Sequence, residues 1–91
     1  MAELISIGTN QTDSADFTLF AGEEATIYLK DESGPQLDAK SYAAIQIKAS
    51  NGEYFTIGYL NCREPAKVIS GAGTYRVRRL LTDVAFGVDK N

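Results

Sequence analysis

The sequence predicts an all-β protein, a single antiparallel β-sandwich or small barrel of about seven or eight short strands. Apolar and polar residues alternate along most of the chain, as in strands with one buried face and one wet face. No segment carries the i, i+3, i+4, i+7 apolar pattern over the roughly eleven residues that a helix needs. Turn-forming residues separate the alternating runs about every 8–12 residues, so we expect residues 1–91 to form one domain.

The first three strands are expected at residues 3–8, 16–21 and 25–30. The last of these reads ATIYLK, in which small or aliphatic residues alternate with threonine, tyrosine and lysine. The preceding AGEE is rich in turn formers. Residues 1–15 are more irregular, and the alternative we keep open for them is an extended arm that lies along a neighbouring subunit.

The next two strands, at 42–49 and 53–60, are expected to form a hairpin. A two-residue turn at Asn51–Gly52 would place the apolar residues of the second strand on the face of Gln46 and Lys48. A loop over residues 50–52, with its glycine in the left-handed conformation, brings the two apolar faces together, and we predict this loop. It pairs Ile47 with Phe55 and Ile45 with Ile57, and its core-facing set is Ile45, Ile47, Phe55, Ile57 and Tyr59.

The remaining strands are expected at 66–70, 74–80 and 84–88. The stretch GAGTYRVRR (71–79) invites comparison with a phosphate-binding glycine loop, which leads from a strand into a helix. Here the glycines lead into an alternating β-forming run, and the P-loop and dinucleotide spacings are missing. We therefore predict a tight hairpin turn between two strands.

The arginines and exposed tyrosines are the candidate interface residues. Arg76 and Arg78 share one strand face. Arg79 breaks the alternation and should lie on the opposite, apolar side or at a bulge, in an ion pair or at an interface. Tyr28 and Tyr54 are expected on wet strand faces. A net charge of −3 argues against nucleic acid as a partner.

Charge is unevenly distributed along the chain. Residues 1–38 carry a net charge of −7 and residues 39–91 a net charge of +4. This asymmetry is compatible with complementary surfaces on neighbouring subunits. It is equally compatible with a sandwich that interleaves both halves, so that opposite charges meet within one chain.

Composition points away from catalysis and cofactors. The chain has no histidine and one cysteine, Cys62, so the commonest general base, a zinc ligand set and an internal disulfide are missing. The acidic loops TDSAD (12–16) and DESGPQLD (31–38) do not match a calcium-binding pattern. We expect no cofactor, no metal and no enzymatic activity. The N-terminus has no signal-peptide pattern and no run suits a membrane span, so synthesis and residence in a cytosol-like compartment are expected.

The phrases DFTLFAGEEATIYLKDESGP, AAIQIKASNGEYFTIG, PAKVISGAGTYRVRR and GVDKN resemble small β-rich virion structural proteins of tailed bacteriophages, of the head decoration or cement type. The resemblance covers most of residues 15–90 and rests on the order of strands and turns. It implies a non-enzymatic virion protein that binds the major capsid protein lattice from outside, commonly as a homotrimer. The N-terminal residues 1–15 and the loop 31–41 are the interface segments we expect from position and composition.

Two other functions stay open. A tail- or fibre-associated module would bind a carbohydrate or a receptor through exposed tyrosines. A head–tail completion protein would differ from a decoration protein chiefly in its copy number per particle.

Overall fold

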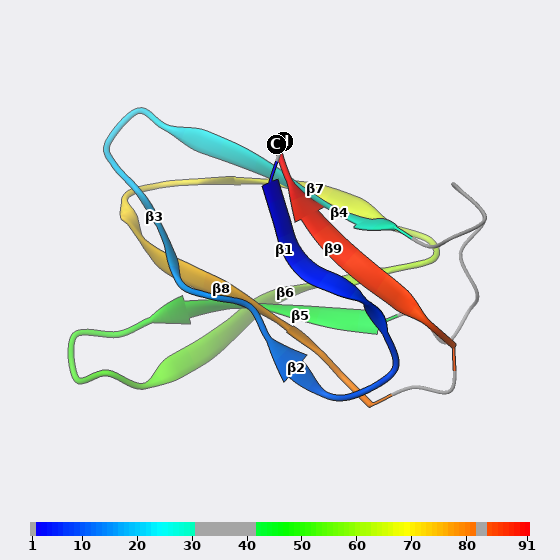
Figure 1. Cartoon of the computed structure of the whole chain (residues 1–91). Helices are drawn as coiled ribbons and strands as arrows, with labels where there is room; N and C mark the ends of the chain where they lie inside the picture. Colours follow the sequence, from blue (N-terminus) through cyan, green and yellow to red (C-terminus); the bar gives the residue numbers. More distant parts are fainter. Residues whose placement is uncertain (1, 31–41, 82–83) are drawn as a thin grey trace.

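The protein is a β-sandwich. The computed structural model describes residues 2–30, 42–81 and 84–91, which form nine strands and no helix in two antiparallel sheets (Figure 1). Sheet A has the strand order β1-β9-β4-β7, and sheet B has the order β2-β8-β5-β6, with β3 also paired to β8. The strands are β1 (Ala2–Gly8), β2 (Thr12–Asp13), β3 (Phe17–Leu19), β4 (Glu24–Lys30), β5 (Tyr42–Lys48), β6 (Tyr54–Asn61), β7 (Ala66–Ser70), β8 (Gly73–Arg79) and β9 (Phe86–Lys90).

The all-β prediction is confirmed, and each of the eight expected strands overlaps an observed one. The short strand β2 was not predicted. Together with β3 it forms a broken edge beside β8, interrupted at Ser14. The Ser14 amide donates to the Val77 carbonyl (2.8 Å) and the Ser14 hydroxyl accepts from the Val77 amide (2.9 Å), so a side chain bridges the gap in the ladder.

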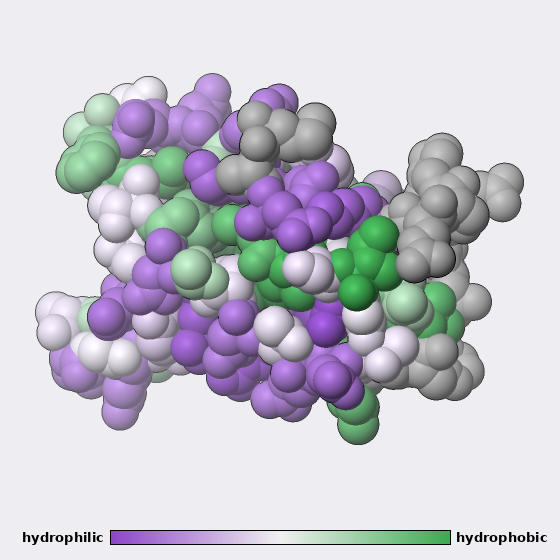
Figure 2. Space-filling view, in the orientation of Figure 1, coloured by the Kyte–Doolittle hydropathy of each residue, from purple (hydrophilic) through white to green (hydrophobic). Residues whose placement is uncertain are grey.

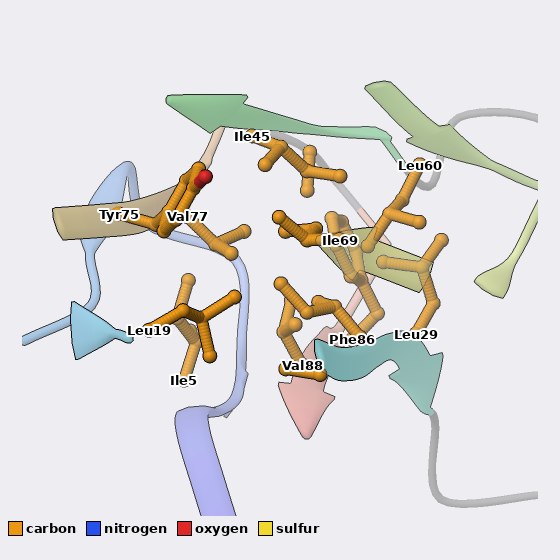
Figure 3. Close-up of a cluster of buried hydrophobic side chains, with 13 residues drawn as sticks. Ile5, Leu19, Leu29, Ile45, Leu60, Ile69, Tyr75, Val77, Phe86 and Val88 are labelled. Atoms are coloured by element: carbon orange, nitrogen blue, oxygen red, sulfur yellow. The ribbon is translucent and has the colours of Figure 1, made fainter. Parts of the chain in front are cut away.

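The core lies between the sheets and follows from the alternation along each strand. Side chains from both sheets point toward one another in Figure 3. The six largest side chains that are fully enclosed come from five strands: Ile27, Ile45, Leu60, Val77, Phe86 and Val88. Burial of such aliphatic and aromatic side chains contributes about 1.5–3 kcal/mol each.

The β5–β6 hairpin matches the prediction close to the turn and departs from it further along. Ala49 N–H donates to the Glu53 carbonyl (2.7 Å), Gly52 has φ 89°, and Ile47 pairs with Phe55, as the three-residue loop requires. A bulge then shifts the register, so that Ile45 pairs with Gly58 instead of Ile57.

The expected core-facing set is therefore wrong for β6. Phe55, Ile57 and Tyr59 are 54%, 53% and 43% exposed. The bulge turns Tyr59 to the outer face, where it pairs with Ala44. Phe55 and Ile57 remain exposed because β6 is the edge strand of sheet B, and strand order is not encoded in the alternation.

The predicted hairpin at GAG is also wrong. β7 pairs with β4 in sheet A, whereas β8 pairs with β5 in sheet B, so residues 71–73 carry the chain from one sheet to the other. The glycines still serve a tight turn, because Gly71 has φ 107°. Tyr75 Oη donates to the Gly71 carbonyl (2.9 Å) and fixes this crossing.

The N-terminal residues do not form a free arm. β1 pairs with the central strand β9, and Ala2 lies opposite Lys90, so the two ends of the chain lie side by side (Figure 1). This pairing depends on Gly87, where an added Cβ would lie 2.5 Å from the Ile5 carbonyl oxygen and 3.0 Å from the Ile7 amide nitrogen.

Replacing Gly87 by alanine should destabilise the protein by about 1–3 kcal/mol, because the backbone of β1 must move away. Urea unfolding measures the change. Ser6→Ala is the control, since its hydroxyl lies on the exposed side of β1 and donates to the Glu3 carboxylate at 3.0 Å. Equal stability of the two variants would contradict this account of the β1–β9 contact.

Candidate interaction surface

The outer face of sheet B collects most of the predicted interface residues. Alternation along β8 places Arg76 and Arg78 on the outside, opposite Gln46 and Ala44 of β5. Tyr54, at the start of β6, lies opposite Lys48 on the same face. We call this surface the outer face of sheet B; it comprises Asp13, Asp16, Tyr42, Ala44, Gln46, Lys48, Tyr54, Thr56, Tyr59, Arg76 and Arg78.

Arg76 lies at the centre of this face, over an aromatic ring. Its guanidinium carbon is 3.5 Å from the centroid of the Tyr54 ring, a cation–π contact. Arg76 Nε donates to Gln46 Oε1 (2.8 Å), and Gln46 Nε2 in turn donates to Thr56 Oγ1 (3.4 Å). Gln46 is buried, so this chain of hydrogen bonds fixes the position of the arginine.

Asp13 joins the two outward arginines. Arg78 donates to both carboxylate oxygens of Asp13, from Nε at 2.7 Å and from Nη2 at 3.2 Å. Arg76 Nη1 lies 3.3 Å from Asp13 Oδ2. The hydrogen bond from Arg78 holds the pKa of Asp13 below its usual value, and Asp13 raises the pKa of Arg78. The two-residue strand β2 is what brings Asp13 opposite Arg78.

A second carboxylate anchors the tyrosine. Tyr54 Oη lies 2.8 Å from both oxygens of Asp16, which follows β2 in the chain. The hydroxyl donates to this carboxylate, and the interaction raises the pKa of Tyr54. Lys48 Nζ lies 3.8 Å from Asp16 Oδ2. The Tyr54 ring is therefore held in one orientation, by Asp16 at its hydroxyl and by Arg76 over its face.

Tyr42 and Tyr59 form a stacked aromatic pair elsewhere on this face. Their ring centroids are 5.0 Å apart with an interplanar angle of 21°. Tyr59 remains 43% exposed and Tyr42 is half-buried, so their rings are accessible. Ala44 lies opposite Tyr59, and its short side chain does not project from the sheet beside the two rings.

This arrangement suits recognition of another surface. Tyrosine and arginine are enriched at the energetic centres of protein interfaces, and here their side chains are already ordered by hydrogen bonds. Ordering before binding reduces the entropy lost on association. Among the described residues, no group of three or more cysteine, aspartate or glutamate side chains is placed to hold a metal ion.

The charge asymmetry of the sequence is partly resolved within the chain. Asp13 and Asp16, from the acidic half, contact Arg76, Arg78 and Lys48 from the basic half. Lys30 in turn lies 2.6 Å from Asp89 Oδ1 and 2.6 Å from Glu3 Oε2 on sheet A. These contacts match the interleaved alternative, in which opposite charges meet in one subunit.

Arg79 does not belong to this surface, in contrast to its place among the candidate interface residues. It lies on the apolar side of β8, as the broken alternation predicted, and is 4% exposed. Its guanidinium donates to three carbonyls, those of Ser6 (2.6 Å), Asn10 (2.8 Å) and Phe86 (2.8 Å). The expected ion pair is absent from the described residues, and burial lowers the pKa of Arg79.

Tyr28 is also separate from the outer face of sheet B. It lies on the outer face of sheet A, between Asp89 and Ala66. Sequence reasoning missed Asp13, Asp16 and the Tyr42–Tyr59 pair as members of the surface. The acidic loop at 12–16 and the wet position of Tyr42 were available signals, whereas Tyr59 was expected to face the core until the bulge turned it outward. The predicted interface loop 31–41 lies outside the described residues.

The fold resembles that of a prophage-derived protein. The crystal structure of SPBc2 prophage-derived protein YomS is similar with a TM-score of 0.71, over 97% of this chain and 86% of that chain, at 10% sequence identity. At this identity the likeness establishes a shared fold. No protein-family model and no curated protein matches the sequence.

Hydrophilic side chains dominate much of the face of the molecule shown in Figure 2, with apolar residues between them. Apolar residues also gather at the upper left, over the turn between β3 and β4, where Phe20 is 67% exposed. Within the described part of the chain there is no helix long and apolar enough to cross a membrane.

Replacing Asp13 by asparagine should lower stability in a pH-dependent way. The folded pKa of Asp13 is depressed below 3.8, so its ion pairs stabilise the fold above the unfolded pKa and are lost as the pH falls through the folded pKa. The difference in unfolding free energy between wild type and Asp13→Asn should be constant above about pH 5 and shrink below it. A difference that does not depend on pH, measured by urea unfolding, would contradict the pairing.

Replacing Arg79 by leucine should cost about 3–5 kcal/mol of stability, because three carbonyls lose a buried donor. Arg79→Lys, which keeps the charge with fewer donors, should lie between leucine and wild type. Arg63→Leu, at an exposed position, is the control and should change stability by less than about 0.5 kcal/mol. Chemical unfolding measures all three, and an Arg79→Leu protein as stable as wild type would contradict this role.

Proposed function

We propose that this chain is a non-enzymatic structural protein of a tailed-bacteriophage particle, and that it binds the outside of the head as a decoration protein. Its partner is then the assembled lattice of the major capsid protein. The observation that carries the binding part of the proposal is the ordered cluster of tyrosine and arginine on the outer face of sheet B.

Two further observations support the phage assignment. The strand-and-turn order of the sequence resembles small virion proteins of tailed phages. The fold is shared with the prophage-derived protein YomS. A small sandwich of 91 residues buries only about 60–65% of its unfolded surface, so docking on a larger assembly adds stability that the core alone supplies sparingly.

The second candidate is a tail- or fibre-associated module that binds a carbohydrate. The stacked Tyr42–Tyr59 pair favours it, because an exposed aromatic face can pack against a sugar ring. This function would place recognition on Tyr59, whereas the decoration function places it on Arg76 and Tyr54. A head–tail completion protein would use the same surface at a few copies per particle.

Co-sedimentation with assembled shells of the phage that encodes this chain tests the proposal. We expect saturable binding to shells at many copies per particle, and none to unassembled capsid protein or a glycan panel. Arg76→Ala and Tyr54→Ala should each weaken shell binding about tenfold or more, as substitutions at energetic centres of interfaces do. Tyr28→Ala, a half-buried tyrosine on the other sheet, is the matched control and should change binding less than about twofold.

Binding to a glycan that Tyr59→Ala abolishes, without binding to shells, would overturn the decoration proposal in favour of the second candidate. Saturation at a few copies per particle would favour the completion protein. The unfolding free energy of each variant is measured alongside, so that lost binding is not confused with lost folding.

A further inference from the structure

The edge strand β6 differs from the other strands in its composition. It is the last strand of sheet B, and at eight residues it is the longest one described. Among the described strands of five or more residues, it alone contains no charged side chain. Exposed edges are usually blunted by charges or proline, yet β6 exposes Phe55 (54%) and Ile57 (53%). These features suit a strand that pairs with another chain.

We propose that β6 pairs antiparallel with β6 of a second copy of this chain. The two-fold axis lies between Ile57 and Gly58, the midpoint of Tyr54–Asn61, and the two copies of sheet B become one continuous sheet. This inference does not rest on the proposed function.

Because of the bulge, this register pairs residues whose side chains point to the same face of the sheet. Before the bulge, Phe55 faces inward and Thr56 outward, opposite Ile47 and Gln46. Beyond the bulge, Tyr59 faces outward and Leu60 inward, opposite Ala44 and Ala43. A two-fold axis at the midpoint pairs Thr56 with Tyr59 of the second copy and Phe55 with Leu60 of the second copy. Outward then meets outward and inward meets inward on both sides of the axis.

The backbone is compatible with the same register. The hydrogen bond at the Ala49–Glu53 pair fixes the alternation along the ladder, which turns the N–H and C=O groups of Thr56 away from β5. Beyond the bulge, Tyr59 occupies the equivalent position. Thr56 and Tyr59 are the residues that the two-fold axis pairs, so they can exchange backbone hydrogen bonds.

The shape at the axis is complementary as well. An open groove of about 260 Å³ lies between the edges β6 and β7, lined by Ile45, Ile57, Gly58, Lys67, Val68, Ile69 and Ser70. The axis places Ile57 of the second copy opposite Gly58, which has no side chain to obstruct it. Each copy therefore supplies one exposed isoleucine to the groove of the other.

Charge selects a second copy in antiparallel orientation. Two chains with a net charge of −3 repel each other, so a contact between them needs a surface free of acids, which β6 provides. Glu53 precedes the strand and Arg63 follows it, and both are exposed. Antiparallel pairing brings Glu53 of each copy to the end that carries Arg63 of the other. Parallel pairing would bring like charges together.

Light scattering across a concentration series tests the contact on the full chain. We expect a dimer for wild type. Ile57→Lys and Ile57→Glu should each raise the dissociation constant of the dimer at least tenfold, because like charges then meet at the axis. An equimolar mixture of the two variants should restore the dimer. Phe20→Lys, in the turn between β3 and β4 and 67% exposed, is the control and should leave the dimer intact.

A wild-type monomer at every concentration would overturn the inference, and so would a dimer that Ile57→Lys leaves unchanged. A wild-type trimer would overturn it too, and would instead agree with the oligomer that the phage resemblance implies. None of these results bears on binding to shells, so failure here and failure of the proposed function are distinguishable.

Cross-linking tests the register. In a Cys62→Ser background, Ile57→Cys should form a covalent dimer, because the two cysteines lie next to the axis within disulfide reach. Oxidised glutathione is the oxidant, and it is reduced to two molecules of glutathione as the disulfide forms. Phe20→Cys, in the turn between β3 and β4, should remain monomeric on a denaturing gel in the same background. Equal cross-linking of the two variants would reject the β6 register.

Discussion

A buried guanidinium holds the two sheets in their relative positions. Arg79 leaves sheet B at the end of β8 and donates to carbonyls on the β1–β2 segment and on β9. Nη2 also lies 3.1 Å from Thr12 Oγ1, in the strand that carries the neighbouring Asp13. A charge that is removed from water must be surrounded by hydrogen-bond acceptors. Residues 6–12 supply several of these acceptors to Arg79, so the guanidinium fixes the path of this segment. The position of Asp13 on the outer face follows from this.

The outer face of sheet B therefore depends on the core behind it. Arg79 fixes the path into β2, β2 presents Asp13, and Asp13 orients Arg76 and Arg78. Because the acids and bases of this face neutralise one another, a partner meets ordered aromatic and guanidinium planes with little net charge. Recognition by such a surface depends on shape and hydrogen-bond direction more than on long-range attraction.

Local patterns predicted what is local. Alternation identified eight strands, the inward side of β8 and the loop at Ser50–Gly52, because each depends on neighbours a few residues apart. It failed at Ile57, where one extra residue reverses the faces of the strand, and at Gly71, where a turn suits a change of sheet as well as a hairpin. Asp13 reaches the outer face through pairing with β8, 65 residues away, which no local pattern encodes.

The side-by-side ends of the chain have a practical consequence. Since Ala2 lies opposite Lys90 in neighbouring strands of sheet A, a peptide or protein fused to either terminus would leave the sandwich from the same point. Both fusions would project from the end of β1 and β9 rather than from the edge strand β6. The old ends could also be joined by a short linker and the chain reopened elsewhere, which would make the sandwich a candidate scaffold for circular permutation and display.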